Sequence, residues 1–212
     1  MLTLLTIIGL SYLLGSFPTS IIFGKLFRGI DIRDYGSGNA GGTNAFRVMG
    51  WKIGISVMII DLAKGLIATV LISQIRIDAI SLAPVYLQII AGFSAVIGHI
   101  WTIFAGFHGG KGVGTAAGML IGLYPVAFIV IFIIFLIVLF TTRYVSVSSM
   151  TAAVSLPVVL LILDKLGRPY KTPLMVLSII IAILIIFTHR SNIGRLMAGT
   201  ENRVNFRKKE KV

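Results

Sequence analysis

The stretch GVGTAAGMLIGLYPVAFIVIFIIFLIVLFTT, residues 112–142, decides the fold of this chain. Read as one helix, about 30 residues at about 1.5 Å each would overshoot a hydrocarbon layer of about 30 Å. A single crossing would also give six spans and leave the basic C-terminal tail outside, against the positive-inside rule. We therefore expect a break near residues 122–125, which makes a short fourth span and a fifth span over residues 126–142.

The composition is that of a membrane protein. Apolar residues make up 57% of the chain and charged residues 12%, and several apolar runs approach the roughly 20 residues that cross a bilayer. We therefore expect an all-α polytopic membrane protein with a single domain over residues 1–212. The chain has no cysteine, which excludes disulfides and thiolate chemistry. The net charge of +12 reflects basic residues at helix ends and in the tail rather than nucleic-acid binding.

Seven transmembrane helices follow from this pattern. The other spans are expected at residues 2–24, 53–73, 84–104, 146–163 and 174–188. No basic residue precedes the first span, and Lys25 and Arg28 follow it, which is the reverse of a signal peptide. The N-terminus is then outside and the C-terminus cytoplasmic. This orientation places most of the 19 Lys and Arg residues inside, including the tail residues Arg203, Arg207, Lys208, Lys209 and Lys211.

Three polar, glycine-bearing segments fall on the cytoplasmic face of this topology. They are GSGNAGGTNAFR (36–47), GHIWTIFAGFHGGKGVGT (98–115) and HRSNIGRLMAGTEN (189–202). Each follows an odd-numbered span, so we expect all three to meet at one inner surface.

The first segment has the composition of an anion site. Its glycines let the backbone reach positive φ and let a ligand approach the N–H groups, and Arg47 offers two donors to one phosphate. A flexible loop would explain the glycines but not the polar side chains between them. The candidate binding residues are Gly36, Ser37, Gly38, Asn39, Gly41, Gly42, Thr43, Asn44 and Arg47.

The second and third segments add a cation and a titratable group. Lys111 stands among Gly109, Gly110 and Gly112, an arrangement that also suits an anion, although Ala105 and Gly112 rule out a nucleotide-binding P-loop. His189 is the type of side chain that exchanges a proton near neutral pH. It is followed by Asn192 and Arg195, which complete the candidate site.

Two charged residues lie inside the second predicted span. Asp61 and Lys64 are three residues apart, share a helix face and are expected to pair. Intramembrane charges are costly and mark functional sites by default, but a pair that only stabilises the bundle fits equally well. His99 leaves the same two interpretations open.

These segments resemble the signature loops of the bacterial acyl-phosphate–glycerol-3-phosphate acyltransferase family, which are integral membrane proteins with seven helices. The likeness covers most of the chain and departs mainly in the second loop, at Trp101, Thr102, His108 and Gly114. It rests on Gly15-Ser16, Pro18-Thr19-Ser20, the 36–47 loop, Asp61-x-x-Lys64-Gly65, the Lys111 loop, His189-Arg190-x-Asn192-Ile193-x-Arg195-Leu196, Gly199 and Glu201.

The resemblance implies transfer of an acyl group from acyl phosphate to the 1-position of glycerol 3-phosphate, giving lysophosphatidic acid and phosphate. Ser37, Arg47 and Lys111 would hold phosphate oxygens, while His189 and Asn192 would orient the hydroxyl. Either His189 or a phosphate oxygen of the donor would take the proton. No cofactor, metal or obligate protein partner is implied, and a monomer in the bacterial inner membrane is expected. The main rival from another class is an anion transporter, which midplane polar residues would favour.

Overall fold

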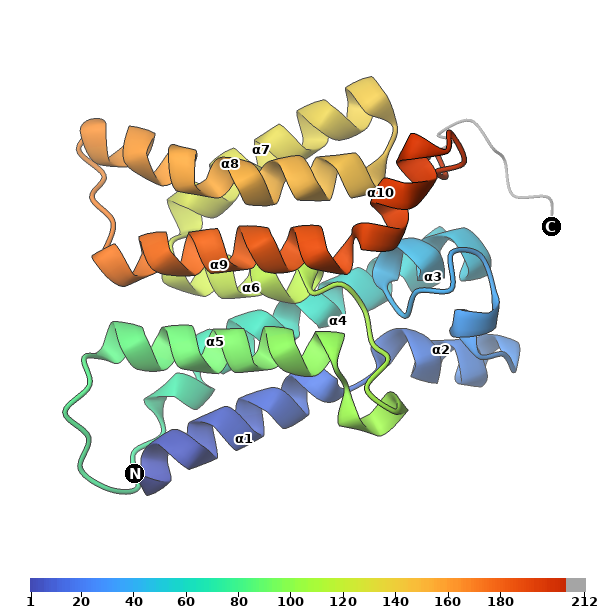
Figure 1. Cartoon of the computed structure of the whole chain (residues 1–212). Coiled ribbons are helices and arrows are strands. Elements are labelled where there is room, and N and C mark those ends of the chain that lie inside the picture. Colours follow the sequence, from blue (N-terminus) through green and yellow to red (C-terminus); the bar gives the residue numbers. More distant parts are fainter. Residues whose placement is uncertain (205–212) are drawn as a thin grey trace. The chain divides into compact units, whose positions relative to one another are not determined.

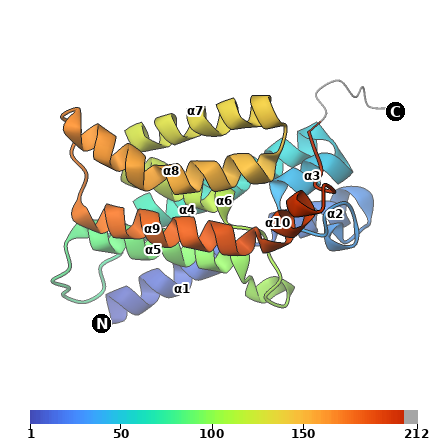
Figure 2. The same cartoon turned by 45° about the horizontal axis from the view of Figure 1, so that its top comes forward.

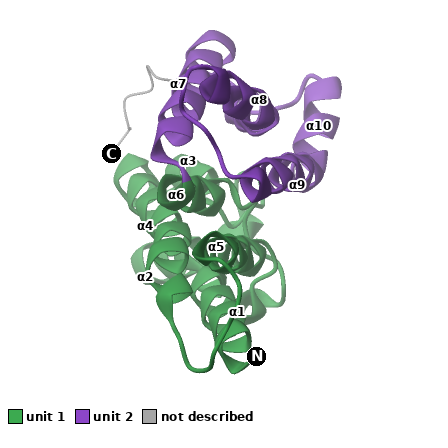
Figure 3. Cartoon of the chain, turned by 90° about the vertical axis from the view of Figure 1, so that its left-hand side faces the viewer, with its two compact units in different colours: residues 1–123 green, residues 124–212 purple. Residues whose placement is uncertain are grey.

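The computed structural model describes residues 1–204, which contain helices and turns but no strand (Figure 1). Its contacts divide the chain into two compact units, residues 1–123 and 124–212 (Figure 3). The all-α prediction is therefore confirmed for the described part of the chain. The tail residues Arg207, Lys208, Lys209 and Lys211, which the charge argument places inside, lie outside that part. The single domain stays a prediction.

The first span is broken by a proline. Helix α1 covers Leu2–Ser16 and helix α2 covers Thr19–Arg28, and the two together form one candidate span, Leu2–Arg28. Pro18 has no N–H to continue the helix, and its ring biases Phe17 away from the helical region. Phe17 indeed lies outside that region, at φ −56° and ψ 111°. The break was not predicted, and it places the Phe17 carbonyl within reach of Lys64.

Four more α-helices complete the first unit: α3 Gly42–Met49, α4 Trp51–Val70, α5 Pro84–Ile100 and α6 Val113–Leu123. Helix α1 packs against α5, and α4 packs against α6 (Figure 1). Both crossings are made through glycine. A Cβ added at Gly15 would lie 2.0 Å from the Ala95 oxygen, and one at Gly65 would lie 1.9 Å from the Thr115 oxygen. Small residues at such crossings let helix backbones approach closely in a membrane.

Three 3₁₀ turns connect these helices: η1 Ile32–Asp34, η2 Ile72–Gln74 and η3 Ile103–Ala105. Turn η1 precedes the first glycine segment and η3 lies inside the second, so both predicted loops of this unit start from ordered backbone. The second half of the first segment is itself helical, because α3 begins at Gly42.

The predicted break in residues 112–142 is confirmed. Helix α6 ends at Leu123 and α7 begins at Pro125, with Tyr124 between them at φ −157° and ψ 80°. Because α6 has 11 residues, it is about 16 Å long, roughly half of the hydrocarbon layer. Within residues 1–204, five helical segments are long and apolar enough to cross a membrane, or six if one bent pair counts as a span. Seven spans and their orientation stay predictions.

The second unit contains four helices within residues 124–204: α7 Pro125–Thr142, α8 Val145–Lys165, α9 Thr172–Thr188 and α10 Arg190–Met197. Helix α8 lies between α7 and α9 and packs against both (Figure 2). Only 6% of the most apolar window of α7 is buried, as expected of a helix that faces lipid. Helices α9 and α10 form the bent pair, with an angle of 57° at His189.

Candidate functional site

The first glycine segment is organised around the side chain of Asn44. Its Oδ1 accepts a hydrogen bond from the Ser37 backbone N–H at 2.9 Å, and its Nδ2 donates to the Tyr35 and Ile32 carbonyls at 2.9 and 3.2 Å. Asn44 is only 2% exposed. Its amide therefore holds the loop together, which is a different task from the phosphate contact that the sequence suggested.

Glycine serves two purposes in this segment. Gly36 and Gly38 adopt left-handed φ values of 65° and 72°, as the sequence predicts. Gly41 and Gly42 do not use this freedom. Gly42 opens α3 in tight contact with α4, where an added Cβ would lie 2.4 Å from Cγ of Met58. At that position glycine is needed for close packing.

Arg47 lies in α3, three residues after Asn44. Its Nη1 lies 3.5 Å from Oδ1 of Asn44, the oxygen that also accepts the Ser37 N–H. The structure therefore brings Ser37 and Arg47 together on one amide. Arg47 is exposed, whereas Ser37, Asn39 and Thr43 are half-buried.

The second glycine segment folds back onto the end of α5. The Gly109 and Gly110 N–H groups donate to the Ile100 and His99 carbonyls, both at 3.0 Å. A Cβ at Gly110 would lie 2.2 Å from Nε2 of His99, so glycine is required for this fold-back. Two backbone N–H groups that the sequence offered to phosphate are thus already engaged.

Lys111 follows this fold-back directly and is half-buried, and Gly112 after it has a φ of 82°. His108 is exposed, with Nδ1 2.6 Å from the Gly106 carbonyl oxygen. Thr102 is one of the positions at which the sequence analysis expected a departure from the family resemblance. It is 2% exposed, and its hydroxyl donates to the Ser16 carbonyl, which ties the start of this loop to the end of α1.

An arginine that the sequence analysis did not select links the first two segments. Arg33 forms a two-point contact with Asp31, with Nη2–Oδ2 at 2.7 Å and Nε–Oδ1 at 3.0 Å. Its Nη1 donates to the Ala105 carbonyl at 3.0 Å. The hydrogen bond from Arg33 lowers the pKa of the Asp31 carboxyl, which keeps the pair charged. The structure thus joins the loop before Ser37 to the loop before Lys111.

The third segment lies in the second unit, where His189 is 3% exposed at the end of α9. Its Nδ1 is 2.8 Å from the Ile185 carbonyl oxygen. A carbonyl only accepts, so Nδ1 must carry the proton and donate it. In the neutral ring Nε2 is then the basic nitrogen.

Glu201 organises the rest of this segment. Oε1 accepts from Nδ2 of Asn192 at 2.7 Å and from the Ser146 hydroxyl at 2.8 Å, and Oε2 accepts from Nε of Arg195 at 2.7 Å. Burial alone would raise the pKa of Glu201, but the hydrogen bonds from Asn192, Ser146 and Arg195 outweigh it and the pKa is lowered. Arg195, predicted to bind substrate, is therefore paired with a carboxylate.

Ser146 was missed by the sequence analysis, and Glu201 was noted only as part of the family likeness. The available signal was weak. Glu201 is an acidic residue in a strongly basic C-terminal region, which indicates that its carboxylate accepts hydrogen bonds from a nearby cationic or amide side chain. Nothing in the sequence connects Ser146 to Glu201 before α8 is placed.

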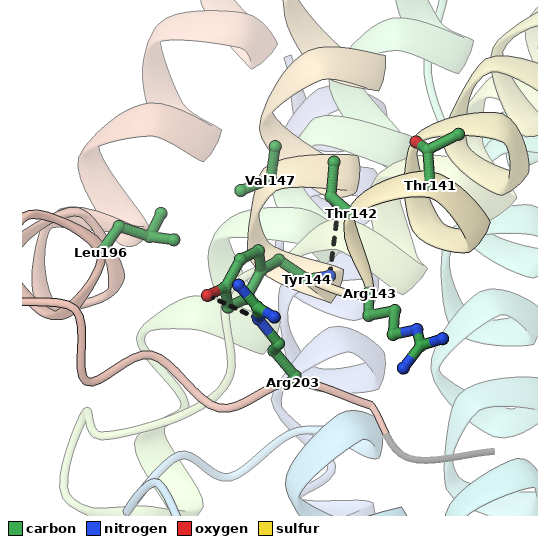
Figure 4. Close-up of a pocket in the computed structure, with 7 residues that line it drawn as sticks. All are labelled: Thr141, Thr142, Arg143, Tyr144, Val147, Leu196 and Arg203. Carbon is green, nitrogen blue, oxygen red and sulfur yellow. Dashed lines mark hydrogen bonds between the residues drawn. The ribbon is translucent and has the colours of Figure 1, made fainter. Parts of the chain in front are cut away.

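The second unit also contains an open hollow of about 550 Å³ where α7 meets α8 (Figure 4). Arg203 lies against Tyr144, donating from Nε to the phenolic oxygen at 2.8 Å, with its guanidinium carbon 5.0 Å from the ring centroid. Arg143 also lines the hollow. The predicted site residues do not line it, and residues 1–204 contain no cluster of His, Asp or Glu that could hold a metal ion.

Within the first unit, the structure brings Ser37, Asn44 and Arg47 together and links their loop to the loop of Lys111. Within the second unit it groups His189, Asn192 and Arg195 around one helix end. That these two groups of residues together bind the phosphates of the two substrates stays a prediction.

Comparison with known proteins gives a consistent result. The family model described as glycerol-3-phosphate acyltransferase matches residues 5–199. The glycerol-3-phosphate acyltransferase of Chlorobium limicola is 49% identical, covering 98% of this chain and 99% of the relative. That of Chlorobaculum tepidum is 49% identical over 99% of this chain and 100% of the relative.

Two solved structures are also similar to this chain. One is the crystal structure of PlsY (YgiH), an integral membrane glycerol 3-phosphate acyltransferase, in its glycerol 3-phosphate form. It has a TM-score of 0.82 and 35% sequence identity, and the match covers 95% of this chain and 96% of that chain. The lysophosphatidic acid form of the same protein matches with a TM-score of 0.79.

Proposed function

Because the chain belongs to the glycerol-3-phosphate acyltransferase family, we propose that it moves a fatty acyl group from acyl phosphate to the sn-1 hydroxyl of glycerol 3-phosphate. The products are lysophosphatidic acid and inorganic phosphate. The observation that carries this proposal is the match over residues 5–199 to the glycerol-3-phosphate acyltransferase family; the acyl phosphate donor and the sn-1 position are part of the proposal. The lysophosphatidic acid form of the similar PlsY structure supports the product.

The donor is already activated, so the protein has little bond chemistry to supply. The glycerol oxygen attacks the acyl carbonyl carbon, the C–O bond to phosphate breaks, and phosphate leaves with the electron pair. Positioning of the two substrates and stabilisation of negative charge then provide most of the acceleration.

Cationic and polar side chains bind and neutralise the phosphate groups of the two substrates. Ser37, Arg47 and Lys111 bind phosphate oxygens, with Thr43 and the remaining loop residues shaping the approach. The side-chain amide of Asn44 supports the proposal indirectly, because it fixes the Ser37 backbone and lies beside Arg47. Arg33 supports it as well, since it joins this loop to the segment that leads to Lys111.

His189 and Asn192 orient the attacking hydroxyl. The hydrogen bond between Nδ1 of His189 and the Ile185 carbonyl leaves Nε2 as the basic nitrogen, and Glu201 fixes the amide of Asn192. The hydroxyl proton passes either to Nε2 of His189 or to an oxygen of the donor phosphate. The pH profile of kcat in His189→Gln separates these routes, because only the first loses a titrating base.

The site faces the cytoplasm in the proposed topology, in a monomer within the bacterial inner membrane. The positive-inside distribution of Lys and Arg supports this orientation. Glycerol 3-phosphate would enter from water and the acyl phosphate from the lipid phase, which suits polar loops at the ends of apolar helices.

Purified protein incubated with palmitoyl phosphate and glycerol 3-phosphate, with phosphate release followed, tests the proposal. Replacement of palmitoyl phosphate by palmitoyl-CoA or by palmitoyl-acyl carrier protein should give no acyl transfer. Arg47→Ala and Lys111→Ala should remove activity while the protein stays folded. Lys52→Ala, at an exposed lysine that touches Trp51, is the matched control and should keep wild-type turnover. Near wild-type rates in Arg47→Ala or Lys111→Ala would remove that residue from the mechanism.

A further inference from the structure

The predicted pair of Asp61 and Lys64 is present and holds the break in the first span. Nζ of Lys64 donates to Oδ1 of Asp61 at 2.7 Å and to the Phe17 carbonyl at 2.6 Å. The Thr19 hydroxyl donates to the same carboxylate oxygen at 3.2 Å. The Lys64 and Asp61 side chains are only 3% and 6% exposed. The Phe17 carbonyl, which lies at the break, thus accepts from Lys64 as well as from the Thr19 N–H at 2.9 Å.

His99 completes this buried cluster from α5. It is 8% exposed, and its Nδ1 lies 3.7 Å from Oδ1 of Asp61, which is beyond hydrogen-bond distance. Beside them lies a cavity of about 10 Å³, roughly the space of one water molecule and too small for a substrate. The cluster is therefore not a second substrate site.

The lining of this cavity shows what the cluster supports. Ala40 reaches it from the first glycine segment, and Gly109 and Gly110 reach it from the second. The ring edge of His99 that carries Nε2 packs against Gly110, where an added Cβ would lie 2.2 Å from that nitrogen. Lys111 is the next residue. Both phosphate-binding loops of the first unit thus rest on one buried polar cluster.

We propose that Asp61, Lys64 and His99 are positioning residues, which set the place of Lys111 through the contact between His99 and Gly110. This rests on the proposed function, in which Lys111 binds phosphate. The alternative is that Asp61 and Lys64 form a pair that only stabilises the helix bundle and has no effect on Lys111. A positioning role predicts that a small change at the His99–Gly110 contact alters glycerol 3-phosphate binding in a protein that remains folded.

A double-mutant cycle at this contact distinguishes the two roles. Gly110→Ala introduces a methyl group into the His99 ring and should raise KM for glycerol 3-phosphate by roughly tenfold. His99→Asn removes the ring atoms that meet this methyl and keeps a polar group toward Asp61. In the His99→Asn background, Gly110→Ala should therefore change KM by less than about threefold. The matched control is Gly114→Ala, where the added Cβ finds its nearest neighbour at 3.4 Å, an ordinary contact.

Hydrogen exchange supplies a readout that does not need activity. The Gly109 and Gly110 amides are bonded to the Ile100 and His99 carbonyls, and both should exchange faster in Gly110→Ala than in Gly114→Ala. An equal KM penalty for Gly110→Ala in both backgrounds would overturn the proposal, as would unchanged KM and exchange in Gly110→Ala. A wild type without acyl transfer would refute the proposed function alone, since hydrogen exchange of these two amides, measured in Gly110→Ala with and without His99→Asn, still tests whether His99 sets the loop.

Discussion

Replacement of Glu201 should lower both the stability of the second unit and the turnover of the enzyme. Glu201 is the shared acceptor for Ser146, Asn192 and Arg195, and its side chain is 6% exposed, against 29% for Arg195. Glu201→Ala removes all three hydrogen bonds at once. Breaking a buried charge pair costs about 3–5 kcal/mol. The partial exposure of Arg195 points to the lower end, so we expect a loss of about 3 kcal/mol in the free energy of unfolding.

Glu201→Gln is the more informative change because it keeps the size of the side chain. Its amide has one oxygen and one NH₂ group, so at least one of the present donors meets another donor. A hydrogen bond to a charged group contributes about 1.5–3 kcal/mol, and we expect a stability loss in that range. Asn192 should also lose its fixed orientation, so kcat should fall by about tenfold or more.

Two measurements test this expectation: equilibrium unfolding in mixed micelles, and steady-state kinetics with palmitoyl phosphate and glycerol 3-phosphate. Asp164→Asn is the matched control, because Asp164 is exposed and lies near the end of α8 in the same unit. If Glu201→Gln matches Asp164→Asn in both stability and kcat, the carboxylate neither holds Asn192 in place nor supports the fold.

Three other perturbations have defined outcomes. Because the pKa of Glu201 is lowered in the folded protein, its contribution to stability is complete at pH values above its ordinary pKa of 4.5 and is lost as the pH falls through the folded pKa. The loss of stability between neutral and acidic pH should therefore be smaller in Glu201→Gln than in the wild type. An equal loss in the two proteins would contradict this. Lys64→Met should destabilise by about 3–5 kcal/mol, whereas Asp61→Leu combined with Lys64→Met should recover most of that loss on thermal melting; equal melting of both variants would refute a paired charge. Arg33→Ala should raise KM for glycerol 3-phosphate with little change in unfolding, because the Asp31 pair is partly exposed; a large drop in stability with unchanged KM would instead make Arg33 a structural residue.

The two breaks in the helical pattern show which part of the fold was predictable. The break at residues 122–125 followed from length, since residues 112–142 exceed one crossing and contain Pro125. The break at Phe17 and Pro18 had no length signal, because residues 2–24 match the layer thickness as one helix, and Pro18 alone was not taken as a break. In the structure the Phe17 carbonyl at this break accepts from the nearby Thr19 N–H and from the distant Lys64 side chain, and the second contact could not be read from the local sequence.

A similar division runs through the candidate site. The pairing of Asp61 with Lys64 followed from helix periodicity, because the two residues are three apart. The tasks of Asn44 and Glu201 did not, since a polar side chain in a loop can serve either a ligand or the loop itself. Asn44 proves to bind the backbone of its own segment, and only the folded chain distinguishes the two uses.

The backbone contacts also change the predicted mode of phosphate binding. The sequence suggested nests of free N–H groups in both loops of the first unit. In the structure the Ser37 N–H is bonded to Asn44, and those of Gly109 and Gly110 are bonded to the end of α5. These groups are unavailable to a ligand unless the loops rearrange. In the proposed mechanism the phosphate charge is therefore balanced chiefly by the Arg47 and Lys111 side chains, and we propose that the glycines place those cations.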